Sequence, residues 1–172
     1  PTLNFNVRSG SQAVQLSRIM MRTEKELLKF KPDLVIVIGD TNSTLGATLA
    51  SVKLHIPVAH IESGPREYFV GHILYRDARM LEMPEEVNRV IIDHCSSILF
   101  APTKSSVQNL KNEKVLGKIY LTGDVSYDVL LQELPKVKEG KRMVPKDFNL
   151  LTVHRAGNTD NLENLRCIVE AI

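Results

Sequence analysis

The sequence has few cysteines, no long apolar run and almost no excess of charge of either sign. Its only cysteines, Cys95 and Cys167, form no CxxC pair, so nothing indicates a disulfide, and a metal site is disfavoured. With 22 basic and 20 acidic residues the formal net charge is +2, which argues against nucleic acid or an anionic membrane as a partner. No apolar stretch approaches the roughly 18 residues of a membrane span. We therefore expect a soluble protein of a reducing, cytoplasmic compartment.

The size and composition are those of a globular protein of one domain, or of one domain plus part of another. The chain has 172 residues, of which 43% are hydrophobic and 24% charged. Its first residues lack the charged and apolar regions of a signal peptide. They also lack an initiator methionine, which predicts that the chain begins inside a longer protein.

Short apolar runs that end at a glycine or a carboxylate alternate with helical patterns. The run at 34–38 is wholly apolar, as in a strand buried on both faces, and leads into Gly39 and Asp40. The run at 58–61 leads into Glu62. Further strands are expected at 98–101 and 119–122, and helices at about 11–30, 44–55 and 102–112 and from Pro84 onward. This alternation predicts an α/β fold with a Rossmann-like parallel sheet and helices on both faces, in which ligands bind at the carboxyl ends of the strands.

A change in composition predicts a boundary near the C-terminal end. Residues 134–147 are rich in charge and contain two prolines, which is typical of a linker. Residues 1–133 would then form the later part of a first domain. A strand at 150–153 and a helix at 161–172 would open a truncated second domain over 148–172, because one strand and one helix cannot form a domain alone.

The acidic residues at the predicted strand ends have both a structural and a functional interpretation. Asp40 is suited to cap the following helix, or to contact a ligand there. Glu62 shares a strand face with His60, and the two could form a simple polar pair. A glutamate in an apolar strand is costly without a purpose, which favours function. Glu85 and Glu86 suit the positive end of a helix dipole, and His94 lies on the apolar stripe of that helix.

Two weaker signals complete the candidates. His154 and Arg155 follow the predicted strand at 150–153, where they could bind a phosphate. A metal site built from His60, Glu62 and His154 lacks the spacing of known ligand sets. Residues 65–83 have no clear period, and loops this long inside a domain are usually functional or disordered.

Taken together, these strings resemble the non-hydrolysing UDP-N-acetylglucosamine 2-epimerase family. The matching strings are GDTNST (39–44), HIESG (60–64), PEEVNR (84–89), FAPT (100–103), LTGD (121–124) and TVHR (152–155). Six collinear segments over nearly the whole chain make a specific match. The strings TGDV and HRAGNTDN favour the archaeal-type members.

The resemblance implies a two-domain fold like that of the B-type glycosyltransferases, with a UDP-sugar bound between two Rossmann-like halves. UDP would leave C1 as the C2 proton is removed, and would then add back with protonation from the other face. By position, Asp40, Glu62 and Glu85 match the family's catalytic carboxylates, and His154 matches its histidine near the diphosphate. The substrate-binding candidates are Arg66, Arg89, His94 and Arg155. No metal or nicotinamide cofactor is implied, and the full-length protein is expected to be a homodimer.

The resemblance also has departures and alternatives. Gly157 stands where the family usually has glutamate, Ser63 replaces a common alanine, and Pro65 replaces a common leucine. A hydrolysing relative would use the same carboxylates but release free ManNAc and UDP. A glycosyltransferase of similar architecture would need an acceptor and would leave three carboxylates unexplained. A non-catalytic module that binds sugar nucleotides is the remaining alternative.

Overall fold

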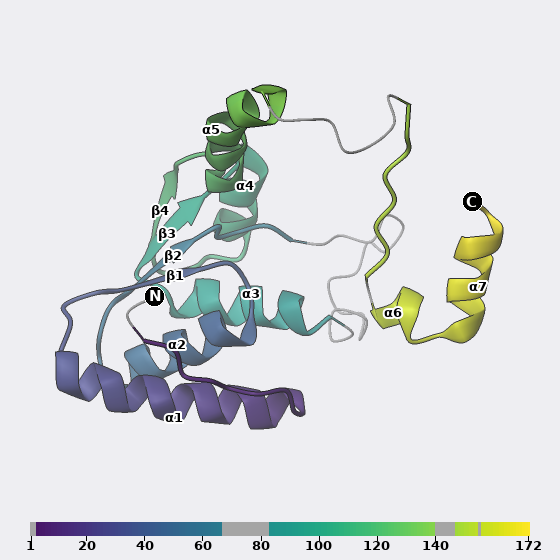
Figure 1. The fold of residues 1–172 in the computed structure, drawn as a ribbon. Helices are drawn as coiled ribbons and strands as arrows, with labels where there is room; N and C mark the ends of the chain where they lie inside the picture. The colour runs from purple at the N-terminus through teal and green to yellow at the C-terminus, as the bar shows by residue number, and fades with distance from the viewer. Residues whose placement is uncertain (1–2, 67–82, 140–146, 155) are drawn as a thin grey trace. The chain divides into compact units, whose positions relative to one another are not determined.

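The computed structural model describes residues 3–66, 83–139, 147–154 and 156–172 of the chain (Figure 1). The chain divides into two compact units, Pro1–Gln132 and Glu133–Ile172, which are described one at a time. The predicted loop at 65–83 lies almost wholly outside the described residues, and so does Arg155.

The first unit is built on a sheet of four parallel strands. The strands are β1 (Val35–Ile38), β2 (Val58–Ile61), β3 (Ile98–Ala101) and β4 (Lys118–Leu121), which pair in that order. In this register Val37 lies beside His60, and His60 beside Leu99. The predicted α/β fold with a parallel sheet is confirmed, and each predicted strand of this unit forms within one residue of its expected position.

The helices of the first unit begin where the sequence places capping signals. The elements are α1 (Gln12–Phe30), α2 (Asn42–Lys53), α3 (Pro84–Cys95) and α4 (Lys104–Asn112). The hydroxyls of Ser11, Thr41 and Thr103 accept hydrogen bonds from the first turns of α1, α2 and α4. Pro84 occupies the first turn of α3, where its missing N–H costs nothing.

The described helices that contact the sheet pack against one of its faces. On that face, Val37 and Val58 meet Leu45 of α2 and Ile92 of α3, and farther along the sheet Leu99 and Ala101 meet Leu110 of α4. The opposite face carries Ile36 and Ile38, each 59% exposed. Strand β1 is therefore buried on one face only, contrary to the expectation of burial on both. Helices on the second face, which were also predicted, are not among the described elements.

The small residues of the helix predicted at 44–55, among them Gly46 and Ala47, favour close packing on the sheet. Ala47 packs against the core that contains Val37 and Val58, as expected. Gly46 faces α1, and a side chain added there would lie 2.6 Å from Ile19. Helices α1 and α2 lie side by side along this contact (Figure 1). The absence of a side chain at Gly46 thus allows α1 to pack closely as an outer layer.

Three further helices lie toward the C-terminus. They are α5 (Val125–Glu139), which crosses the boundary between the units, α6 (Ala156–Thr159) and α7 (Leu162–Glu170). Helix α5 was not predicted, and it continues through Pro135, within the segment assigned to a linker. Helix α7 was predicted, and the side chain of Asn161 caps it.

The strand predicted at 150–153 is wrong. Residues 150–154 form neither strand nor helix. A strand needs a neighbour to satisfy its backbone hydrogen bonds, and no strand of the described chain pairs with this segment. Among the described residues, no helix is both long enough and apolar enough to cross a bilayer.

Candidate active site

Residues with a left-handed backbone follow three of the four strands. Gly39 after β1 has a φ of 70°, Glu62 after β2 has a φ of 71°, and Gly123 after β4 has a φ of 88°. Only glycine adopts this conformation without a steric cost, which for other residues is roughly 1–2 kcal/mol. Glu62 is therefore a strained carboxylate at the carboxyl edge of the sheet. Backbone strain of this kind is concentrated at functional sites.

Asp40 is held at the same edge by Arg89 of α3. The Arg89 guanidinium donates from Nε to Asp40 Oδ2 at 2.7 Å, and its Nη2 lies 2.6 Å from the same oxygen. Its Nη1 donates to Glu86 Oε2 at 2.8 Å. Burial alone would lower the pKa of Arg89, but the hydrogen bond to Glu86 and the charge of Asp40 outweigh it and raise that pKa. Asp40 stays about a quarter exposed, so it can still contact a ligand.

Glu62 and Glu85 both lie near the turn that carries Asp40. The Glu62 carboxylate reaches back toward Gly39, where a side chain would lie 3.7 Å from Oε2. Glu85, in the first turn of α3, is exposed and lines a cavity of about 340 Å³ beside the start of α2. The structure thus brings Asp40, Glu62, Glu85 and Arg89 to one edge of the sheet.

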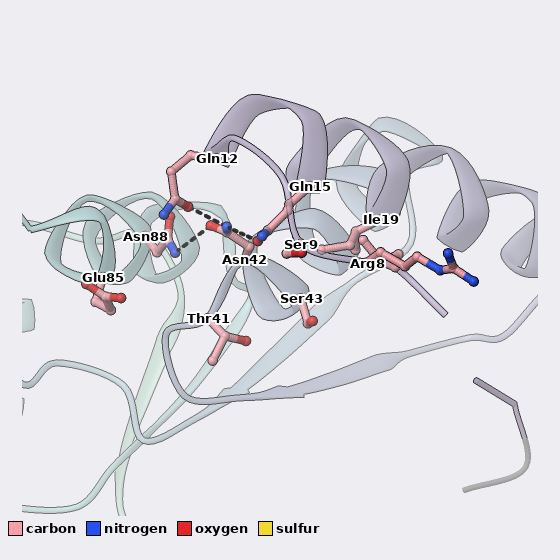
Figure 2. Close-up of a pocket in the computed structure, with 11 residues that line it drawn as sticks. Arg8, Ser9, Gln12, Gln15, Ile19, Thr41, Asn42, Ser43, Glu85 and Asn88 are labelled. Atoms are coloured by element: carbon pink, nitrogen blue, oxygen red, sulfur yellow. Dashed lines mark hydrogen bonds between the residues drawn. The ribbon is translucent and has the colours of Figure 1, made fainter. Parts of the chain in front are cut away.

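The cavity next to Glu85 is lined mostly by polar side chains from α1, α2, α3 and the segment before α1. Asn42 is at its centre, and its Nδ2 donates to Gln12 at 2.5 Å and to Gln15 at 3.2 Å (Figure 2). Asn88 donates to Asn42 Oδ1 at 3.3 Å and to the backbone oxygen of Asp40 at 2.8 Å. These bonds tie the Asp40 turn to α3. Sequence reasoning missed Asn42, Asn88 and the two glutamines.

A buried network of charged side chains lies beneath this edge. His60 is fully buried, and its Nδ1 lies 2.7 Å from Asp93 Oδ1, while its Nε2 lies 2.9 Å from the backbone oxygen of Gly39. Asp93 Oδ2 accepts a hydrogen bond from the backbone N–H of Gly64 at 3.0 Å. Both ring nitrogens of His60 are thus occupied by Asp93 and Gly39, and the polar pair with Glu62 that the sequence suggested is not formed.

Arg66 is the third ionisable residue of this buried network. Its guanidinium lies 2.8 Å from Asp93 Oδ2 and 2.6 Å from Glu113 Oε2, and its side chain is only 2% exposed. Burial alone would lower the pKa of Arg66, but the hydrogen bond to Glu113 and the charge of Asp93 raise it well above its usual range. A substrate contact for Arg66 stays a prediction. In this structure its donors already meet two carboxylates.

The remaining candidates lie at the surface or in the second unit. His94 has a side chain 43% exposed, with Nε2 3.4 Å from Glu113, so it is not the core histidine that the apolar stripe suggested. His154 is an exposed residue of the second unit, and its position relative to Asp40 stays a prediction. Cys95 and Cys167 are free thiols, and burial raises the pKa of Cys95. The described residues contain no cluster of three or more metal-binding side chains.

Comparison with known proteins gives a consistent result along the whole chain. The family model described as UDP-N-acetylglucosamine 2-epimerase matches residues 1–172. A UDP-N-acetylglucosamine 2-epimerase homolog of Methanococcus maripaludis is 44% identical over 99% of this chain and 47% of its own length. A UDP-2,3-diacetamido-2,3-dideoxy-D-glucuronate 2-epimerase of Pseudomonas aeruginosa is 40% identical over 100% of this chain and 47% of its own length.

A solved structure matches as well. The crystal structure of Methanocaldococcus jannaschii UDP-GlcNAc 2-epimerase, in complex with UDP-GlcNAc and UDP, has a TM-score of 0.87 and 42% identity. The match covers 99% of this chain and 46% of that one, so the chain spans about half the length of these proteins. On its sequence and its fold, the chain belongs to the UDP-N-acetylglucosamine 2-epimerase family.

Proposed function

We propose that this chain is part of a non-hydrolysing epimerase that interconverts UDP-GlcNAc and UDP-ManNAc. The observation that supports this most directly is the placement of Asp40, Glu62 and Glu85 around the turn that follows β1, at the carboxyl edge of one parallel sheet. A sugar nucleotide is the substrate class to expect, because the Methanocaldococcus jannaschii relative is described with UDP-GlcNAc and UDP bound.

The chemistry accounts for the need for several carboxylates. The C1–O bond to UDP breaks with its electron pair, the C2–H bond is lost to a base, and a C1–C2 double bond forms as 2-acetamidoglucal. UDP then adds to C1 while a proton reaches C2 from the opposite face. The C2 proton is weakly acidic, so the C1–O bond breaks early and positive charge develops on the ring. Carboxylates can stabilise this charge and transfer protons on two faces.

We assign Asp40, Glu62 and Glu85 to these proton transfers and charge contacts. Arg89 would fix the orientation of Asp40, because its Nε donates to Asp40 Oδ2 and its Nη2 lies 2.6 Å from the same oxygen. His154 would contact the diphosphate from the second half of the protein, with Arg155 beside it. His94 is exposed enough for a substrate contact.

The sugar itself has a second candidate, which the Pseudomonas aeruginosa relative supports. That protein is a 2-epimerase of a 2,3-diacetamido glucuronate, and its identity of 40% is close to that of the UDP-GlcNAc enzymes. Both substrates are UDP-2-acetamido sugars and differ at C3 and at C6. Comparing kcat/KM for the two substrates with one preparation would decide between them.

Proton NMR of UDP-GlcNAc in D₂O, with the longest natural form of the protein, tests the proposed reaction. Loss of the C2 proton signal together with growth of UDP-ManNAc signals is the expected result. Accumulation of free ManNAc and UDP would assign the protein to the hydrolysing type. Transfer of the sugar to an acceptor without C2 exchange would indicate a glycosyltransferase. An unchanged spectrum would contradict the proposal and favour a binding module, or a disabling effect of Gly157.

The 172-residue chain alone is expected to have little or no turnover. It spans 47% of its Methanococcus maripaludis relative, so much of the proposed cleft would lie elsewhere in the longer protein. The same NMR assay on both forms tests this, and equal rates would contradict it. We further propose that the longer protein is a cytoplasmic homodimer, which sedimentation equilibrium would test for its oligomeric state.

A further inference from the structure

One buried carboxylate, that of Asp93 in α3, contacts the backbone next to two of the proposed catalytic residues. Asp93 is fully buried. Its Oδ1 lies 2.7 Å from His60 Nδ1, and its Oδ2 accepts from the Gly64 N–H at 3.0 Å. It is the most buried carboxylate of the described network.

The first connection runs through His60 to the turn that carries Asp40. His60 Nε2 lies 2.9 Å from the carbonyl oxygen of Gly39, and that carbonyl belongs to the peptide bond that leads into Asp40. A carbonyl oxygen can only accept, so Nε2 must donate to it. Asp93 fixes the other ring nitrogen, and it thereby sets the direction in which the imidazole presents Nε2.

The second connection runs directly to the turn after Glu62. Gly64 lies two residues beyond Glu62, in the same strained segment, and its N–H points at Asp93. Glu62 has a left-handed backbone, which persists only where surrounding contacts hold it. The hydrogen bond to Asp93 is one such contact.

Asp93 also has a cationic partner in this network. Arg66 lies 2.8 Å from Asp93 Oδ2 and also pairs with Glu113, so its charge offsets that of the buried carboxylates. Removing the charge of Asp93 would leave Arg66 with one carboxylate partner fewer in a buried site, which is costly. The network therefore favours one arrangement of both turns.

We propose that Asp93 is a positioning residue, which holds Asp40 and Glu62 in register with each other from beneath the sheet edge. This rests on the proposed function for the roles of Asp40 and Glu62. The loops that follow two adjacent strands are both connected to this carboxylate, one through His60 and the other through Gly64. The carboxylate of Asp93 thereby fixes the distance between the Asp40 and Glu62 side chains before the sugar binds.

The test is Asp93→Asn in the longest natural form of the protein. An asparagine keeps the shape but removes the negative charge that pairs with Arg66, and one of its two terminal atoms becomes an NH2 group that cannot accept a hydrogen bond. It therefore cannot replace both acceptor oxygens that Asp93 presents to His60 and Gly64. We expect kcat to fall by about 100-fold with KM changed less than about twofold, because misplacing reacting groups slows the chemical step. The matched control is Asp33→Asn, an exposed residue at the opposite end of β1, which should behave as wild type.

A measurement that does not depend on enzymatic turnover tests the positioning role of Asp93 separately from the proposed function. In amide NMR spectra, Asp93→Asn should shift the signals of Gly39, Asp40, Glu62 and Gly64, while those of α1 stay in place. His60→Asn is the second variant, because its shorter side chain can reach Asp93 but not the Gly39 carbonyl. It should shift Asp40 while leaving Glu62 unchanged, and this also serves if Asp93→Asn fails to fold.

The outcomes have distinct meanings. An unchanged kcat per folded molecule for Asp93→Asn would overturn the positioning role. Unmoved Asp40 and Glu62 signals in both variants would overturn it as well, even if the wild type has no epimerase activity. Inactivity of the wild type with the expected amide shifts would instead contradict the proposed function and support the positioning of the two turns by Asp93.

Discussion

At the scale of the single residue, we predict that replacing Ser63 with alanine stabilises the protein. Its side chain is fully buried, and within the described part of the chain its hydroxyl has no hydrogen-bond partner. An unsatisfied buried polar group costs about 1–3 kcal/mol. Ser63→Ala should therefore raise the free energy of unfolding by about 1 kcal/mol. Urea unfolding of the purified chain measures it.

Ser51→Ala is the matched control for this prediction. Ser51 is equally buried, but its hydroxyl donates to the backbone oxygen of Ala47 at 2.7 Å. Its replacement should lower the free energy of unfolding by about 0.5–1.5 kcal/mol. If both substitutions destabilise the protein equally, the Ser63 hydroxyl has a partner, and the argument from burial fails.

The candidate site could be predicted from the sequence only in part, and the reason is again visible in single residues. Asp40 and Glu62 are recognisable because each directly follows an apolar strand, and parallel strands end at one edge. Asp93 and Glu113 follow no strand. Their importance comes from Arg66, which is 47 positions before Glu113 in the chain. Pairs this distant in sequence leave no local pattern.

At the scale of the element, the turns that follow β2 and β4 each contain a glycine, and we expect substitution of these two glycines to cost different amounts of stability. Gly64 and Gly123 both have positive φ angles, of 85° and 88°. A side chain at Gly64 would lie 2.5 Å from the backbone oxygen of Ser106, whereas one at Gly123 would meet nothing within 4 Å. Gly123→Ala should cost about 1–2 kcal/mol from backbone strain alone. Gly64→Ala adds a backbone clash and should cost several kcal/mol more.

Urea unfolding of the two variants distinguishes these contributions. The difference between them isolates the packing of the turn after β2 against α4, because the strain in φ is common to both. A similar loss for the two substitutions would mean that α4 can move away from the turn at little cost. That would contradict the close packing of Gly64 on Ser106 and Leu110.

The elements themselves were predictable where local signals and tertiary contacts agree. The four strands of the sheet and helices α1 to α4 have apolar patterns, caps and a proline that point to the same structure. The strand expected at 150–153 failed because an apolar run cannot become a strand without a partner. Helix α5 was missed because a proline such as Pro135 usually ends a helix. A helix can nevertheless continue past a proline when the neighbouring residues favour the helical conformation, as α5 does.

At the scale of the whole molecule, apolar burial is concentrated on one face of one unit. The core side chains of the first unit come from the face that α2, α3 and α4 cover. On the other face, Ile36 and Ile38 are largely exposed. In the second unit, no residue of α7 is buried, and Leu162 is 82% exposed. Burial of apolar surface is the main stabilising contribution to folding, so the two units should differ in stability.

Amide hydrogen exchange of the 172-residue chain tests this difference within one sample. Backbone N–H groups of β2 and β3 lie in the buried sheet and should exchange only through large-scale unfolding. The N–H groups of α7 should exchange by local opening, because no buried apolar contact holds that helix. Their protection factors should be at least about 100-fold lower than those of β2 and β3. The two groups of amides share pH, temperature and preparation, so each is the control for the other. Equal protection would show that α7 gains its stability from contacts other than buried apolar surface, and would contradict a stable core confined to the first unit.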